Sequence, residues 1–349
     1  MRASLIRSLL VAAAASVPVA TTTDAATLIV LNKSDDNVSL IEPTTGRVYA
    51  TIPVGDAPHE AATSPDGKTV VVCNYGPRGA PGHTLSIIDL PTQQVIRTID
   101  LVKYHRPHGV QFFPDGKRIV VTSEEAKKLL IVDIESANVD AAIDTDQDIS
   151  HMVAMTHDQR LAFVANISSG SASVIDLTTQ SLKKVIHTGE QAEGIAAHPT
   201  RNEVWVSNRR GDTINIIDTT TLEIIQEMPC GEVPIRVAFT PDGSKALVSC
   251  AQSADVAIFD AESRKLIDRV PMEIDPKEVT TEGRLFGKRF GDSPVPIGIL
   301  IEPTGKLAYV ANTNADIITV IDIAAAKVVD RLIAGREPDG LAWSPLTGS

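Results

Sequence analysis

The sequence predicts an all-β protein in which seven four-stranded blades close into a ring. Three observations support this fold class. A unit of about 42 residues recurs along the chain. Each unit holds four short apolar, β-branched runs separated by turn residues. The two ends of the chain carry complementary parts of one further unit. Four strands at this period are typical of a propeller blade.

The N-terminal segment is expected to be a targeting signal rather than part of the fold. Arg2 and Arg7 make a positively charged start, an apolar run follows over 9–19, and small residues come next. The run is shorter than the roughly 20 residues that span a bilayer. We therefore expect a cleaved signal peptide over 1–25, a periplasmic or secreted protein without a membrane span, and one propeller domain over 26–349.

The repeats are recognised by a turn, often Pro-x-Gly, that leads into the first strand of each unit. One complete repeat has its four strand-like runs at 194–197, 203–207, 213–218 and 222–226. The repeats begin at Pro58, Pro107, Ser150, Ala192, Pro234, Pro296 and Pro338. Two of the units are longer than the rest and therefore carry insertions.

The two ends of the chain predict how the ring closes. The last repeat stops after one strand, 340–344, whereas the N-terminal side supplies three, at 27–31, 38–41 and 47–52. One strand plus three complete a seventh blade. Such closure leaves no open sheet edge at the seam.

Composition excludes several classes of function. With 44 acidic and 32 basic side chains the net charge is −12, which argues against a nucleic-acid partner. The three cysteines, Cys73, Cys230 and Cys250, form neither a disulfide framework nor a C-x-x-C pair. The sequence contains no Gly-x-Ser-x-Gly elbow, His-Glu-x-x-His helix or phosphate-binding loop. We expect no nucleotide or organic cofactor, and a monomer.

Most of the repeated polar residues have a structural interpretation. Aspartates end Val/Ile-rich strands before turns, where a carboxylate accepts backbone N–H groups, and asparagines stand at the exits of other strands. The aspartates are Asp89, Asp133, Asp176, Asp218, Asp260 and Asp322, and the asparagines are Asn32, Asn74, Asn166, Asn208 and Asn312.

The repeats resemble a known family. Ala308-Tyr-Val-Ala-Asn312, followed by Val320-Ile-Asp322 and accompanied by Pro-x-Gly and Pro-Asp-Gly turns, is similar to the YVTN family of seven-bladed propellers. That family includes proteins called lactonase-like. The resemblance covers 27–345 and implies the fold. It does not decide the function, because propellers of this kind include surface-layer proteins, binding proteins and enzymes.

Function is expected where one column of the repeat varies. The second residue of the turn that enters the first strand reads, around the ring, His59, His108, His151, Glu193, Ile235, Ile297 and Asp339. These positions lie at the mouth of the central channel. His59, His108, His151 and Glu193 predict a transition-metal site for Zn, Cu, Fe, Ni or Mn. Two other interpretations stay open: a mouth that holds water or a small anion, and acid–base use of the histidines.

The next column and one insertion add positive charge. Where other blades have glycine, this column has Glu60, Met152 and Arg236. Arg236 would receive a substrate carboxylate or phosphate, or else pair with a glutamate of the chain itself. The insertion over 273–295 contains Arg284-Leu-Phe-Gly-Lys-Arg-Phe290 and is expected to be a lid or a partner-binding loop.

Three classes of function therefore remain. In the first, an exported propeller binds a transition metal or a small polar or anionic ligand through the histidines and Glu193. In the second, a metal-free lactonase-like hydrolase uses Glu193 or a histidine to activate water, and Arg236 to stabilise the oxyanion. The third is a scaffold that binds another exported protein. The sequence leaves open whether the protein is an enzyme.

Overall fold

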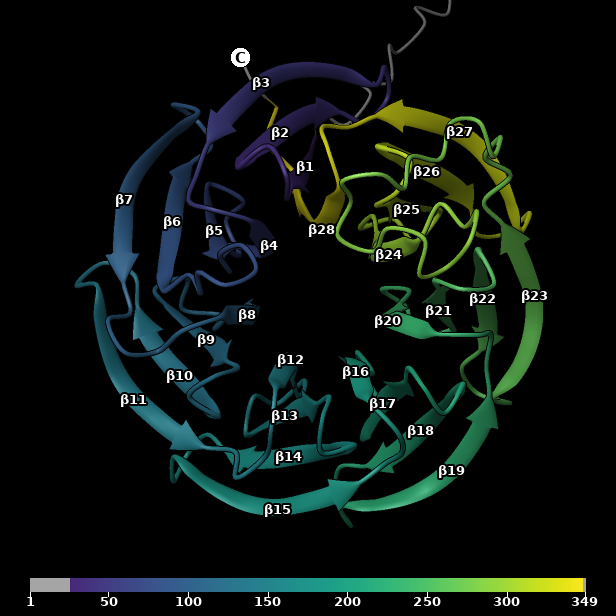
Figure 1. Ribbon diagram of the computed structural model, residues 1–349. Coiled ribbons are helices and arrows are strands. Elements are labelled where there is room, and N and C mark those ends of the chain that lie inside the picture. Colours follow the sequence, from purple (N-terminus) through teal and green to yellow (C-terminus); the bar gives the residue numbers. More distant parts are fainter. Residues whose placement is uncertain (1–25, 348–349) are drawn as a thin grey trace, which may run out of the picture.

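The computed structural model describes residues 26–347, which form a ring of seven four-stranded antiparallel sheets (Figure 1). The predicted all-β, seven-bladed fold is confirmed. The predicted signal peptide lies outside the described residues. Within 26–347 there is no helix long and apolar enough to cross a membrane.

Each blade takes four consecutive strands, except the blade shared between the two ends of the chain. Blade 1 consists of β4 Pro58–Thr63, β5 Thr69–Asn74, β6 Thr84–Asp89 and β7 Gln94–Asp100; blade 2 of β8 Pro107–Phe112, β9 Arg118–Ser123, β10 Lys128–Asp133 and β11 Asn138–Asp144; blade 3 of β12 Ser150–Met155, β13 Leu161–Asn166, β14 Ser171–Asp176 and β15 Ser181–His187.

The remaining blades follow the same order. Blade 4 consists of β16 Ala192–Ala197, β17 Glu203–Asn208, β18 Thr213–Asp218 and β19 Glu223–Pro229; blade 5 of β20 Pro234–Phe239, β21 Lys245–Cys250, β22 Asp255–Asp260 and β23 Lys265–Pro271; blade 6 of β24 Pro296–Ile301, β25 Leu307–Asn312, β26 Ile317–Asp322 and β27 Lys327–Ile333; blade 7 of β28 Pro338–Ser344, β1 Thr27–Asn32, β2 Asn37–Glu42 and β3 Arg47–Pro53.

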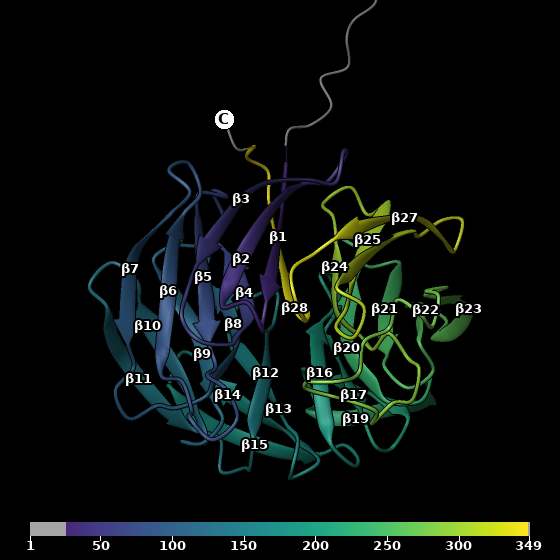
Figure 2. The same ribbon diagram turned by 45° about the horizontal axis from the view of Figure 1, so that its top comes forward.

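Blade 7 closes the ring as predicted. Its innermost strand, β28, comes from the C-terminal end and pairs antiparallel with β1 from the N-terminal side, with Thr27 opposite Ser344 and Leu28 opposite Trp343. Figure 2 shows the two strands side by side. The last strand of the ring therefore completes the blade in which the described chain begins.

The apolar core lies between neighbouring blades. Val71 and Leu85 of blade 1, for example, pack with Val121 and Leu130 of blade 2, all four fully buried. The second and third strands of a blade, such as β5 and β6, are buried on both faces. The outermost strand β7 instead exposes five of its seven residues. Burial of the flat faces of seven sheets against one another holds each inner strand at a set distance from the ring axis.

The start of every inner strand is irregular in the same way. In β4 the first residue, Pro58, pairs with Asn74, but regular pairing resumes only at Ala61, so that His59 and Glu60 are left out of the ladder. The residue just before each inner strand has a positive φ of 47° to 60°. These residues are Ala57, Arg106, Ile149, Gln191, Val233, Val295 and Glu337. This bulge releases two residues per blade from regular pairing, and the side chain of the first is directed toward the channel.

Glycine in the second bulge position allows the blades to approach each other. A Cβ at Gly298 would lie 1.9 Å from the carbonyl oxygen of Asp339 in the next blade, and one at Gly194 would lie 2.2 Å from that of Ile235. The blades that carry Glu60, Met152 or Arg236 there instead place a side chain near the axis.

Candidate functional site

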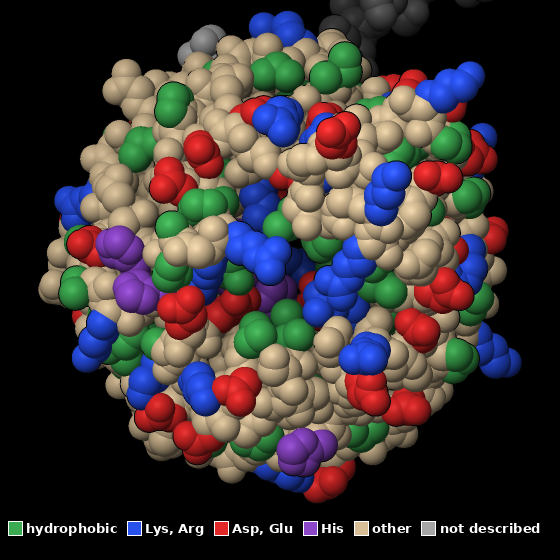
Figure 3. Space-filling model, viewed as in Figure 1, with side chains coloured by type: hydrophobic (Ala, Val, Ile, Leu, Met, Phe, Trp, Pro, Cys, Tyr) green, Lys and Arg blue, Asp and Glu red, His purple; other side chains and the backbone are tan. Residues whose placement is uncertain are grey.

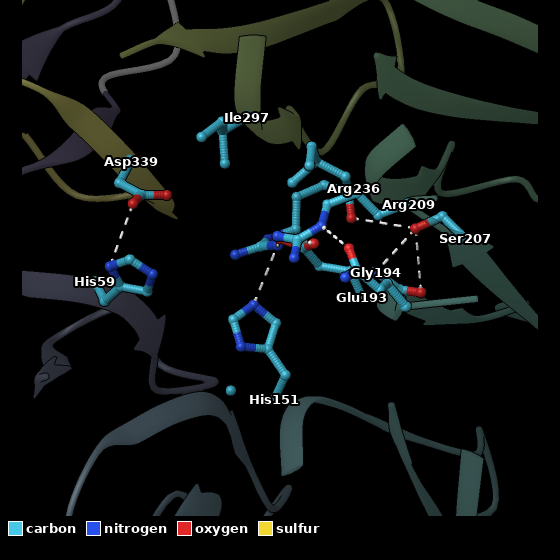
Figure 4. A network of polar contacts seen from close by, with 12 residues as sticks. His59, His151, Glu193, Gly194, Ser207, Arg209, Arg236, Ile297 and Asp339 are labelled. Atoms are coloured by element: carbon cyan, nitrogen blue, oxygen red, sulfur yellow. Dashed lines mark hydrogen bonds and ion pairs between the residues drawn. The ribbon is translucent and has the colours of Figure 1, made fainter. Parts of the chain in front are cut away.

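The polar residues of the predicted column meet inside the channel (Figure 4). The ring centroid of His108 lies 4.3 Å from that of His59 and 3.6 Å from that of His151. His59, His151 and Glu193 are 9%, 6% and 6% exposed, and His108 is fully buried. The structure therefore brings the three predicted histidines together, with Glu193 beside them.

A second column, which sequence analysis missed, completes the channel wall. It is the residue that follows the second strand of each blade: Lys33, Tyr75, Glu124, Ile167, Arg209, Ala251 and Thr313. In every blade its N–H donates to the carbonyl of the residue before the inner strand, as Glu124 does to Arg106 at 3.1 Å. The sequence repeat could have identified this column, because five of its residues directly follow the repeated asparagines.

Glu124 joins His108 and His151 in the tightest group of donors. Its Oε1 lies 2.5 Å from His151 Nδ1, and its Oε2 accepts a hydrogen bond from the Tyr75 hydroxyl at 2.6 Å. One potential ligand atom from each of His108, Glu124 and His151 lies within 4.8 Å of the others. Both ring nitrogens of His108 and Nε2 of His151 are buried without a hydrogen-bond partner among the described residues.

Burial sets the protonation of this group. Desolvation lowers the pKa of His151 to about 3, although the Glu193 carboxylate opposes this shift. Desolvation also lowers the pKa of His108 well below its usual value, with further lowering from His151, Arg236 and Lys33. Both imidazoles are therefore neutral at physiological pH. Burial also raises the pKa of Glu124 to about 7, although the hydrogen bond from Tyr75 opposes this rise. The cluster thus contains two neutral nitrogen donors and a carboxylate that titrates near neutrality.

The side of the site formed by blades 7 and 1 is held by charged partners. Asp339 Oδ2 lies 3.2 Å from His59 Nδ1 and 3.4 Å from Lys33 Nζ, and that ammonium is 3.2 Å from His59 Nε2. Tyr75 stacks on His59 with ring centroids 4.8 Å apart. Burial lowers the pKa of Lys33, and Asp339 opposes this effect. His59, unlike His108, has a charged group near each ring nitrogen, although its Nδ1 makes no hydrogen bond.

Arg236 forms the chain's own Arg–Glu pair, but with Glu60 rather than Glu193 as its nearest partner. Its Nη2 lies 2.6 Å from Glu60 Oε1, which joins blade 5 to blade 1 across the channel, and its Nη1 lies 3.9 Å from Glu193 Oε1. Arg209 Nη1 lies 2.6 Å from Glu193 Oε2. Burial would lower the pKa of Arg236, but the surrounding carboxylates outweigh it and raise the pKa. The assignment of Glu193 and Arg236 as catalytic stays a prediction.

The insertion over 273–295 packs on the apolar side of the mouth. Phe290 and Val295 are buried with Ile235 and Ile297, and Phe286 packs at their edge. The insertion is anchored by Arg284, whose guanidinium makes two bonds of 2.6 Å to Asp316. Figure 1 shows it as the long loop over β24 and β25. Its role as a lid stays a prediction, but it lies where a lid would.

The face that carries the insertion is hollowed at its centre. Figure 3 shows Lys and Arg side chains around the hollow and histidine deeper within it. A groove of about 450 Å³ beside the mouth is lined by residues that include Arg209, Arg210 and Arg289. Positive charge is therefore concentrated at this entrance, although the protein as a whole is acidic.

Comparison with known proteins agrees with this architecture. The model of the YNCE-like beta-propeller family matches residues 3–123 and 125–284. The chain belongs to this family. The predicted resemblance to seven-bladed YVTN propellers is thus confirmed.

One solved structure illustrates how widely this fold is used. The propeller resembles Kuenenia stuttgartiensis hydrazine synthase, with 18% identity, a TM-score of 0.69, and coverage of 82% of this chain and 90% of that one. At this identity the similarity shows the fold alone. No curated protein matches the chain significantly.

Proposed function

We propose that this YNCE-like propeller is an exported protein that binds a transition-metal ion in its channel through His108, His151 and Glu124. The observation that carries the proposal is His108, a fully buried imidazole whose two nitrogens make no hydrogen bond. It lies against His151, whose Nδ1 contacts Glu124 and whose Nε2 makes no hydrogen bond and lies 3.8 Å from Glu193 Oε1. Buried polar groups are nearly always satisfied, and an ion is one of the few partners that fit two converging imidazoles.

The donor set fits a borderline divalent cation. Neutral imidazole is the form that donates a lone pair, and the lowered pKa values of His108 and His151 keep both rings in that form. Two histidines and one carboxylate are typical of zinc and non-haem iron sites that keep an open position. Donors around zinc, with bonds of about 2.0–2.2 Å, lie closer than the 4.8 Å seen here, so the side chains would contract slightly on binding.

The surrounding residues have supporting roles in this proposal. Tyr75 donates to the Glu124 oxygen that faces away from His151, which orients the carboxylate. His59 stands next to His108 and is the nearest further imidazole. Glu193, the expected fourth donor, is engaged by Arg209 and Arg236 instead. Its participation remains a prediction that the experiment below separates from that of Glu124.

To test this, untagged protein is stripped of metal with a chelator and titrated with zinc, and calorimetry measures the binding. We expect one zinc per chain for the wild type. His108→Gln and Glu124→Gln should each weaken zinc binding more than about tenfold, because each removes a donor. Glu193→Gln should have a much smaller effect. His83→Gln is the matched control, because this exposed histidine lies 3.6 Å from Asp100, outside the cluster.

Two outcomes would overturn the proposal. One is stoichiometric zinc in folded His108→Gln and Glu124→Gln proteins. The other is a wild type that takes up none of Zn, Cu, Fe(II), Ni or Mn. A loss of binding in Glu193→Gln but not in Glu124→Gln would reinstate the donor set expected from the sequence.

A further inference from the structure

We propose that Cys230 and Cys250 are an oxidisable pair, and that a disulfide between them joins the loop entering blade 5 to the end of that blade's second strand. The two Sγ atoms lie 3.8 Å apart, although 20 positions separate the residues in the sequence. Sequence spacing predicted no cysteine pairing. All three cysteines are free, but the fold brings the residue after β19 next to the last residue of β21.

Both cysteines are held by backbone bonds that keep the thiols facing each other. Cys230 directly follows β19, and its N–H donates to the carbonyl of Asp212 at 2.8 Å. Cys250 ends β21 and is paired with Pro234 on one side and Asp255 on the other. Glycine at 231 permits this close approach, since a Cβ there would lie 2.8 Å from Cys250 Sγ.

The two thiols differ in access and reactivity. Cys230 is partly exposed, whereas Cys250 and the third cysteine, Cys73, are buried. The hydrogen bond from Cys250 lowers the pKa of Cys230, and the nearby Arg269 guanidinium lowers it further. Arg269 is fixed beside them by two contacts of 3.0 and 3.1 Å with Asp255. Cys230 is therefore the thiol that reacts first.

The oxidation requires a disulfide as the oxidant. The Cys230 thiolate attacks one sulfur of that disulfide, which forms a mixed disulfide and releases one thiolate. Cys250 then gives its proton to solvent and its sulfur attacks Cys230 Sγ, which expels the second thiolate. Two protein thiols are oxidised and the oxidant is reduced to two thiols. The sulfurs must approach from 3.8 Å to about 2.05 Å when the bond forms.

The position of this disulfide connects it with the channel mouth. The loop that follows Cys230 leads through Val233 to Ile235 and Arg236, and Val233 packs in the cluster that contains Phe290 of the insertion. Ala251, next to Cys250, lies in the same cluster. A cross-link here would hold the apolar surface on which the insertion packs. The inference does not depend on metal binding.

The test is incubation of the full chain with oxidised glutathione, followed by peptide mass spectrometry and thiol titration in denaturant. We expect a Cys230–Cys250 peptide pair lighter by two hydrogen atoms, with Cys73 as the one remaining thiol. Cys250→Ser should stop at a glutathione adduct on Cys230, and Cys230→Ser should form no disulfide. Cys73→Ala is the matched control and should oxidise like the wild type.

A second measurement tests whether Arg269 activates the Cys230 thiol or whether the two cysteines are merely close together. Arg269→Met should slow the oxidation at neutral pH, and raising the pH should restore the rate, because the guanidinium acts by favouring the thiolate. Three free thiols after oxidation, or a wild-type adduct on Cys230 that does not resolve, would overturn the proposal. So would equal oxidation rates of Cys73 and Cys230 in the folded protein.

Discussion

The channel wall has two arcs built on the same backbone position, and they differ in how their side chains are satisfied. The polar arc contains Asp339, His59, His108, His151 and Glu193, and most of its members pair with residues of the second column. The apolar arc, Ile235 and Ile297, is covered by Phe290 of the insertion. The same bulge in every blade presents both sets to the channel.

This difference shows how a symmetric repeat makes an asymmetric site. Burial on the apolar arc is completed by the chain itself, through the insertion. On the polar arc, both nitrogens of His108 lack a hydrogen bond among the described residues, and Nε2 of His151 has only a 3.8 Å contact with Glu193 Oε1. The apolar arc is therefore packed by the chain itself, whereas the polar arc keeps buried nitrogens that make no hydrogen bond.

The largest effect is expected from a polar side chain in the apolar arc. Ile297→Asn removes buried apolar surface and buries an amide beside Phe290. It should lower the free energy of unfolding by about 4 kcal/mol in urea denaturation. Ile297→Val is the matched control and should cost about 1 kcal/mol. Equal stability of the two variants would show that the apolar arc is not a packed region.

A smaller effect of opposite sign is expected in the polar arc. His108→Leu removes two unsatisfied nitrogens, so the metal-free protein should gain about 1–2 kcal/mol of stability while it loses zinc binding. His59→Leu should instead be destabilising, because it removes the partner of Lys33 and Asp339. Chemical denaturation of both variants without metal checks this contrast. A His108→Leu protein less stable than the wild type would mean that the imidazole supports the fold.

The smallest effect concerns pH. The pKa of Glu124 is about 7 in the folded protein and 4.5 in its unperturbed state, so the folded state holds a proton that the unfolded chain has released. The corresponding stability is lost as pH rises through 7. Relative to Glu124→Gln, metal-free wild type should therefore lose about 1 kcal/mol between pH 6 and pH 8. The comparison with Glu124→Gln assigns this pH dependence to the Glu124 carboxyl. Parallel stability curves would contradict the raised pKa.

Much of this protein could be predicted from the repeat. The blade number, the closure of blade 7 and the channel position of His59, His108 and His151 follow from register alone, because each repeat places the same position at the same radius. The column that contains Glu124 was available from the same register, one residue beyond the repeated strand ends. It was overlooked because the strand ends themselves had a structural interpretation.

Contacts across the ring were decided only by the tertiary structure. Glu60 meets Arg236 although 176 positions separate them, and Cys230 meets Cys250 across a blade connection. The repeat period predicts which positions are equivalent, and therefore which strand and which face of the sheet a residue occupies. The period does not predict which partner a side chain contacts across the channel, or how deeply that side chain is buried. Those depend on the curvature that seven packed sheets impose, which is why the pairing of Glu60 with Arg236 emerged only in three dimensions.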